Sequence, residues 1–124
     1  MSQPIDRQAE FSGTRDVRDA HRFDERALTN YLQTQIPGFT PPMTVEQFKG
    51  GQSNPTYKLV TATACYVLRR KPPGKLLPSA HAVDREYRVI KALHALGLPV
   101  AKPHLLCADA NIIGTEFYVC LLYT

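Results

Sequence analysis

The chain is organised around one ten-residue stretch, Phe48-Lys49-Gly50-Gly51-Gln52-Ser53-Asn54-Pro55-Thr56-Tyr57. Segments of alternating polarity on either side of it, residues 44–48 and 56–60, predict two strands. The two glycines, the serine, the asparagine and the proline between these segments are typical of a turn. The stretch therefore predicts a β-hairpin.

Two functions are open for the turn at residues 50–54. It can be an ordinary hairpin loop, which is the usual outcome for an isolated glycine-rich motif. It can also cover the phosphates of a nucleotide, because glycines let the backbone approach an anion closely. Successive backbone N–H groups, together with the Ser53 hydroxyl, could then donate hydrogen bonds to that anion. The choice depends on residues elsewhere in the chain.

Length and composition predict one small domain. The chain has 124 residues, of which 44% are hydrophobic, and this is enough to form a core. A net charge of +4 suits an anionic ligand, but no run of Lys and Arg has the density of a nucleic-acid-binding arm. No aromatic stacking platform is evident on an exposed strand either. We therefore expect no nucleic acid as a partner.

Cysteine and histidine usage predicts neither disulfides nor a metal site. The three cysteines and four histidines are scattered and show no ligand spacing. The N-terminus is polar rather than a signal peptide, and no apolar run has the length of a membrane span. Reduced thiols and the lack of such segments predict a cytoplasmic protein that does not bind a membrane.

A pass along the chain predicts the remaining elements. Residues 1–23 are polar and without hydrophobic period, which predicts a flexible arm before a domain at 24–124. Asp24 is a suitable N-cap for a helix over residues 25–35. The other expected elements are strands at 65–70, 104–107 and 116–121 and a helix at 80–96 with Ser79 as its cap and Gly97 at its end.

The second helix contains a carboxylate in an unusual place. Glu86 falls within an apolar stripe formed by Val83, Tyr87, Ile90, Leu93 and Leu96. A carboxylate directed at a core is costly unless a cation meets it. Arg69, which shares one face of its strand with Val67 while Arg70 lies on the other, could supply that cation. The alternatives are that Glu86 reaches water at a loosely covered edge and that Arg69 is a solvated strand end.

The order of these parts resembles the N-terminal lobe of the kinase-like phosphotransferases, the aminoglycoside phosphotransferase and choline kinase superfamily. The similarity is greater to the branch that also occurs fused to acyl-CoA dehydrogenases. It rests on the motifs at residues 50–57, 66–74, 76–87 and 113–119 and spans roughly residues 24–119. The resemblance implies an α+β fold, a five-stranded antiparallel sheet with one packed helix and one leading helix.

The resemblance also implies a function for individual residues. The turn would cover the phosphates of ATP with Gly50, Gly51, Gln52, Ser53 and Asn54. Arg69 would stand where such kinases place a strand lysine against the α- and β-phosphates, and Glu86 would be its partner on the helix. Whether Arg69, Arg70 or Lys71 contacts phosphate stays open. Tyr118 and Val119 would belong to the strand that enters the adenine-binding hinge.

The activity implied by the resemblance is transfer of the γ-phosphoryl group of ATP, with Mg²⁺, to a hydroxyl group of a small molecule. The branch implies a hydroxyacyl-CoA as acceptor rather than an aminoglycoside. In this family the catalytic Asp and the Mg²⁺ ligands lie in a second, helical lobe, and we find no candidate for either role in this chain. We therefore expect a truncated lobe that is inactive alone and self-associates through an exposed surface that includes Val119, Leu121 and Leu122. The rival interpretation is a non-catalytic remnant that binds a nucleotide or a partner.

Overall fold

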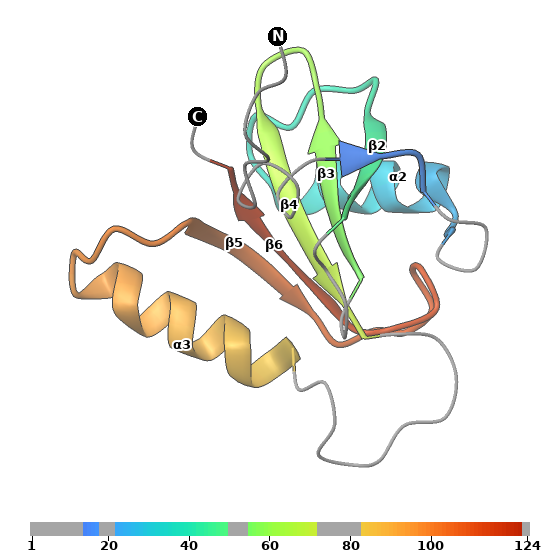
Figure 1. Ribbon diagram of the computed structural model, residues 1–124. Helices are drawn as coiled ribbons and strands as arrows, with labels where there is room; N and C mark the ends of the chain where they lie inside the picture. Colours follow the sequence, from blue (N-terminus) through green and yellow to red (C-terminus); the bar gives the residue numbers. More distant parts are fainter. Residues whose placement is uncertain (1–13, 18–21, 50–54, 72–82, 123–124) are drawn as a thin grey trace, which may run out of the picture.

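The computed structural model describes residues 14–17, 22–49, 55–71 and 83–122. The elements are, in chain order, β1 (Thr14–Arg15), α2 (Glu25–Gln35), β2 (Thr44–Phe48), β3 (Thr56–Val60), β4 (Cys65–Arg70), α3 (Val83–Ala95), β5 (Lys102–Cys107) and β6 (Phe117–Leu121). The strands form one antiparallel sheet in the order β1-β2-β3-β4-β6-β5. Figure 1 shows α2 behind this sheet and α3 beside β5.

The leading helix has the predicted bounds and the predicted cap. The Asp24 carboxylate accepts a hydrogen bond from the Ala27 backbone N–H at 3.0 Å, which satisfies one of the free donors of the first turn. Leu28 and Leu32 are fully buried and lie one helical turn apart. These two leucines attach α2 to the sheet.

The main core lies between α2 and one face of the sheet. The side chains of β3, β4 and β6 that point to this face alternate with those that point away. The buried members of this core are Leu28, Leu32, Ile36, Phe39, Tyr57, Leu59, Tyr66, Leu68, Leu105, Cys107, Ile113, Phe117 and Val119. The α2 face of the sheet is therefore closed to water over most of its width.

The other face carries a smaller core under α3. Val83 and Tyr87 of the helix pack with Tyr118 and Cys120 of β6. Burial raises the pKa of the Cys120 thiol to about 11, so this cysteine is a packing residue rather than a reactive thiolate. The apolar stripe predicted for this helix is wrong at its last residue, since Leu96 is 76% exposed and does not pack against the sheet. Leu96 follows the last residue of α3, where the chain already turns away.

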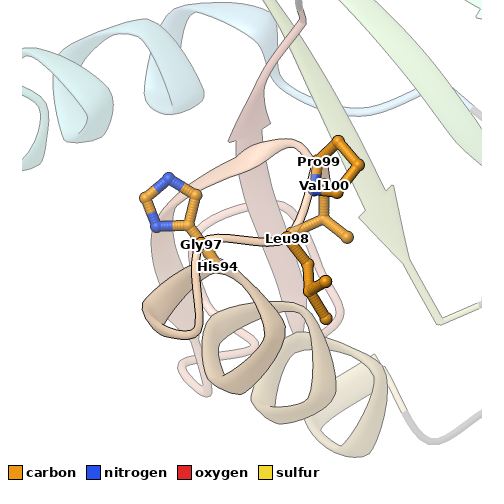
Figure 2. Close-up of a pocket in the computed structure, with 5 residues that line it drawn as sticks. All are labelled: His94, Gly97, Leu98, Pro99 and Val100. Atoms are coloured by element: carbon orange, nitrogen blue, oxygen red, sulfur yellow. The ribbon is translucent and has the colours of Figure 1, made fainter.

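The C-terminus of α3 is closed by Gly97, as predicted (Figure 2). Gly97 has φ +80°, its N–H donates to the carbonyl of His94 at 3.0 Å, and the N–H of Leu98 donates to the carbonyl of Leu93 at 3.1 Å. These two bonds form a Schellman motif. A hollow of about 470 Å³ lies here, lined by His94, Gly97, Leu98, Pro99 and Val100.

The strand order places β6 in the interior of the sheet, between β4 and β5. Helices therefore cover both of its faces, and four of its five residues are buried. The expectation that Val119 is exposed is wrong, because its side chain is 0% exposed and belongs to the α2-side core. Leu121 and Leu122 are half-buried.

Two details of the sheet were not predicted. β1 lies within the interval expected to be a flexible arm, and the Thr14 hydroxyl donates a hydrogen bond to the Glu46 carboxylate of β2. β5 begins at Lys102 rather than at residue 104, although it includes Pro103. β5 is an edge strand, where a proline is tolerated because one side of the strand has no ladder to join.

Candidate functional site

The candidate site begins with Arg69, the penultimate residue of β4. In the register of the sheet, Arg69 lies opposite Thr56 of β3 and opposite Tyr118 of β6. Residues directly opposite on neighbouring strands project to the same face. Because Tyr118 packs against α3, Arg69 and Thr56 also belong to the α3 face.

Glu86, in the first turn of α3, meets Arg69 as predicted. The Arg69 Nη1 lies 3.1 Å from the Glu86 Oε1, which makes a hydrogen-bonded ion pair between strand and helix. The Arg69 and Glu86 side chains are 34% and 35% exposed, so water reaches the pair. A pair in such surroundings contributes less than about 1 kcal/mol to stability. The pair therefore acts mainly by orienting the Arg69 guanidinium.

Tyr118 joins the same carboxylate from β6. Its hydroxyl donates a hydrogen bond to the Glu86 Oε1 at 2.9 Å, so one oxygen accepts from both Arg69 and Tyr118. Burial and the nearby negative charge of Glu86 raise the pKa of Tyr118 well above its usual value, although Arg69 acts in the opposite direction. Tyr118 is therefore a neutral donor at any physiological pH.

Arg70, the next residue, is on the opposite face and is 2% exposed. Its Nε donates to the Tyr57 hydroxyl and its Nη1 donates to the Ile113 carbonyl, both at 3.1 Å. The guanidinium also lies over the rings of Phe23 and Tyr57 at 5.4 and 5.7 Å from their centroids. Arg70 is thus a core residue that a ligand on the α3 face does not reach.

Lys71 completes the basic segment. Its Nζ lies 3.3 Å from the Glu116 Oε2, and its backbone N–H donates to the Glu116 carbonyl at 3.2 Å. Of the three basic residues left open by the sequence, Arg69 is the one whose side chain lies beside Glu86. Arg69 is therefore the member of this basic segment that pairs with the helix carboxylate on the α3 face.

The surroundings of Arg69 can accept an anionic ligand. A hollow of about 490 Å³ opens beside the ion pair, lined by Arg69, Arg85, Glu86, Val89, Ile90 and Tyr118. The residues predicted to cover phosphates, Gly50–Asn54, lie outside the described residues, as does the predicted cap Ser79. Lys49 and Pro55, which flank that turn, do belong to the described part, and the Pro55 carbonyl accepts from the Arg70 N–H at 3.2 Å. Pro55, which follows the turn, thus lies at the Arg69 end of the sheet.

The described ranges contain no group of three His, Cys, Asp or Glu side chains close enough to hold a metal ion. The carboxylates of the site are used otherwise, since Glu86 accepts from Arg69 and Tyr118. The described residues therefore fit the phosphates of a nucleotide but do not by themselves form a site for Mg²⁺. Within those same ranges, neither helix is long and apolar enough to cross a membrane.

The antiparallel sheet lies between α2 and α3, and a cation of β4 pairs with a carboxylate of α3. This is the arrangement of the N-terminal lobe of the protein-kinase-like fold. The comparisons with known proteins agree. The model of a family described as "Phosphotransferase enzyme family" matches residues 44–121. The chain belongs to this phosphotransferase family.

The relatives include both longer polypeptides and a solved structure. Acyl-CoA dehydrogenase family member 11 of Mus musculus is 53% identical over 112 residues, which cover 87% of this chain and 14% of the relative. The Homo sapiens protein of that name is 48% identical over 108 residues, which cover 84% of this chain and 14% of the relative. A crystal structure from Ralstonia eutropha, assigned as an aminoglycoside phosphotransferase, matches with 46% identity and a TM-score of 0.71.

Coverage differs between these matches. The match to the Ralstonia eutropha structure covers 83% of this chain and 29% of that structure. The chain spans about one-seventh of the length of the curated relatives, as their 14% coverage shows. The similarity therefore describes one lobe-sized part of larger proteins.

Sequence reasoning brought Arg69 and Glu86 together but missed two features. It did not anticipate that the Tyr118 hydroxyl donates a hydrogen bond to Glu86, and the nucleotide-binding role that it gave to the Tyr118 strand stays a prediction. It left Arg70 open as a phosphate contact, although the alternation along β4 already put Arg70 on the other face from Arg69. The side chain of Val119 lies in the α2-side core and so does not face the candidate site.

Proposed function

We propose that this chain is the nucleotide-holding lobe of an ATP-dependent phosphotransferase that acts on a hydroxyl group of a small molecule. The observation that carries the proposal is the 3.1 Å pair between Arg69 and Glu86 on the α3 face of the sheet. A guanidinium oriented by a carboxylate and left about one-third exposed is suited to bind phosphate oxygens. Membership of the phosphotransferase family supports the same assignment.

Each part of the site has a distinct task in this proposal. Arg69 binds the α- or β-phosphate, and Glu86 fixes the direction of its N–H groups. Gly50–Asn54, the glycine-rich segment, would donate backbone hydrogen bonds to the phosphates. ATP supplies the γ-phosphoryl group. The Mg²⁺ ligands and the base that orients the acceptor come from the part of a longer phosphotransferase that this chain does not cover.

The acceptor that we propose is a hydroxyacyl-CoA. The support is the name of the curated relatives, acyl-CoA dehydrogenase family members, at 47–53% identity for family member 11. An enzyme domain in one polypeptide with an acyl-CoA dehydrogenase would share its class of substrate.

Nucleotide titration tests the assignment of Arg69. The polypeptide 1–124 should bind ATP with a Kd of about 1 mM, equivalent to about −4 kcal/mol, since half of a cleft supplies half of its contacts. Arg69→Met should weaken this binding at least fivefold. Arg88→Met is the matched control, because Arg88 lies on α3 with its side chain 74% exposed. Equal affinities of the wild type and Arg69→Met would contradict the proposal.

Turnover tests the reaction. With ATP, Mg²⁺ and a panel of hydroxyacyl-CoAs, 1–124 should transfer no phosphate, whereas a fusion to the remainder of a relative's phosphotransferase domain should do so. Turnover by 1–124 would show that the catalytic groups lie within this chain. Nucleotide binding with no turnover by the fusion would favour the rival, a non-catalytic nucleotide-binding remnant.

A further inference from the structure

We propose that Tyr118 is a positioning residue for Arg69 and that it acts through the carboxylate of Glu86. The starting observation is that a single oxygen, the Glu86 Oε1, accepts from the Tyr118 hydroxyl at 2.9 Å and from the Arg69 Nη1 at 3.1 Å. The three side chains come from β6, α3 and β4. The inference rests on the proposed function in one respect, namely that Arg69 is the phosphate-binding group.

The Arg69–Glu86 pair does not hold itself in place. Both side chains have many rotatable bonds, both are about one-third exposed, and an ion pair in contact with water gains little over the entropy that it costs. The Arg69 Nε is also buried without a hydrogen-bond partner among the described residues. The direction of the guanidinium therefore depends on where the Glu86 carboxylate is fixed.

Tyr118 is the rigid member of the three. Its side chain is buried in the small core under α3, and its ring lies 5.8 Å from the ring of Tyr87. A packed tyrosine has two side-chain torsions and a hydroxyl at the end of a stiff ring. The hydroxyl thus presents a fixed donor to Glu86, and a hydrogen bond to a charged group is among the stronger ones.

The position of Tyr118 in the sheet makes this arrangement specific. Tyr118 is the cross-strand partner of Arg69, so the two side chains leave the same face of the sheet side by side. Glu86 of α3 contacts both side chains. Because β6 is paired with β4 along its whole length, Arg69 and Tyr118 are held side by side, and one oxygen of the Glu86 carboxylate accepts from both.

The test measures the order of the Arg69 side chain in the polypeptide 1–124. The ¹⁵N–{¹H} NOE and the hydrogen-exchange rate of the Arg69 Nε–H report whether the guanidinium is held. Tyr118→Phe keeps the packed ring and removes the hydroxyl, so it should lower the NOE and raise the exchange rate at least threefold. Tyr87→Phe is the matched control, since Tyr87 is a buried tyrosine of the same core whose hydroxyl makes no hydrogen bond in the described structure.

A second variant separates positioning from a general loss of structure. In a Glu86→Ala background, Tyr118→Phe should cause no further change in the Arg69 signals, because the residue through which Tyr118 acts is gone. The thermal midpoints of Tyr118→Phe and Tyr87→Phe should differ little. An Arg69 side chain that is equally ordered in the wild type and in Tyr118→Phe would overturn the inference, as would an additive effect in the Glu86→Ala background.

Titration with ATP keeps the inference distinct from the proposed function. If Tyr118 positions a phosphate-binding Arg69, Tyr118→Phe should weaken ATP binding about three- to tenfold, and Tyr87→Phe should not. If the Arg69 signals change in Tyr118→Phe but the wild-type chain does not bind ATP, the positioning by Tyr118 stands and the proposed function fails. If the wild type binds ATP, but Tyr118→Phe changes neither the ATP affinity nor the Arg69 signals, the positioning role of Tyr118 is rejected and the proposed function is kept.

Discussion

Two adjacent arginines, Arg69 and Arg70, lie on opposite faces of the sheet and differ in burial and in their contacts. On the α2 face, Arg70 is buried, lies 5.4 and 5.7 Å from the centroids of two aromatic rings and is hydrogen-bonded to Tyr57 and to the Ile113 carbonyl. On the α3 face, Arg69 meets one carboxylate and remains about one-third exposed. The alternation of side chains along a strand is enough to make one of two neighbours in sequence a core residue and the other a partly exposed one.

The difference between the faces has a physical source in the two helices. α2 lies over a broad apolar core in which Leu28, Leu32 and Ile36 are fully buried. α3 also buries two side chains, Val83 and Tyr87, but the core beneath it is much smaller, and Val89 on its surface is 57% exposed. A face that is incompletely covered leaves charged groups in contact with water, which a binding site requires.

The largest effect is expected from truncating one side chain on each face of β4. Leu68→Ala should lower the free energy of unfolding by about 3–5 kcal/mol, because Leu68 is fully buried in the α2-side core. Val67→Ala should cost about 1 kcal/mol or less, since Val67 is half-buried on the other face. Urea denaturation of both variants measures the difference. Similar losses would show that the two faces are equally well packed.

The two arginines provide the next test. Arg70→Met should destabilise the chain by about 1–3 kcal/mol, since it leaves the Ile113 carbonyl without its buried donor. Arg69→Met should cost less than about 1 kcal/mol and should affect nucleotide binding instead. Denaturation gives the free energy of unfolding of each variant, and titration gives the ATP affinity of each. If Arg70→Met changed the ATP affinity without changing the stability, the assignment of Arg70 to the core and of Arg69 to the binding site would be wrong.

A smaller effect is expected at the end of α3. Gly97 has φ +80°, and a Cβ added there would meet nothing within 4 Å, so backbone strain is what opposes an alanine at this position. Gly97→Ala should therefore lower the free energy of unfolding by about 1 kcal/mol. Gly97→Asn should cost less, because asparagine adopts this conformation more readily. Equal stability of all three proteins would mean that this end of α3 is not formed in solution.

The smallest effect is a dependence on pH that comes from the α2 face. Burial, and secondarily the positive charge of Lys102, lowers the pKa of His104, whose ring packs against Tyr66. The unfolded chain then binds the proton more tightly than the folded chain. Stability should be full above about pH 6.5, the usual value for histidine, and should fall as the pH drops below it.

Unfolding free energies of the wild type and His104→Phe, measured between pH 7.5 and 5, test this dependence. The variant should lose the decline seen in the wild type. Lys102→Met should make that decline shallower, because it removes one of the two causes of the lowered pKa. A wild type and a His104→Phe variant with the same pH profile would exclude His104 as the source.

Local patterns in the sequence predict the local structure well. The bounds of β2, β3, β4 and α2 agree with the alternation, the turn residues and the Asp24 cap. The pair of Arg69 and Glu86 also follows from a pattern, since an inward carboxylate on an apolar stripe needs a cation nearby. The family resemblance predicted the kinase-like lobe, which the structural match confirms.

Features set by long-range pairing were not accessible in this way. The insertion of β6 between β4 and β5 decides that Val119 is buried and that Tyr118 lies beside Arg69, and no local signal specifies that strand order. Likewise, the short β1 pairs with β2 across a gap of about thirty residues. The register shift in β5 between Pro103 and Leu105, which allows His104 to face Tyr66, depends on the neighbouring strand as well.

The interior position of β6 sets the order in which a ribosome can complete this sheet. β4 and β5 are both made before the strand that separates them, and the pairing edge of β4 stays open until residue 121 has been added. At 5–20 residues per second, synthesis from residue 70 to residue 121 takes roughly 3–10 s. During that time the nascent chain carries an unpaired, largely apolar strand edge, which is a template for pairing with another chain. The middle of the sheet is thus the last part to be made, and its delayed closure is the step at which a nascent copy is most exposed to misassembly.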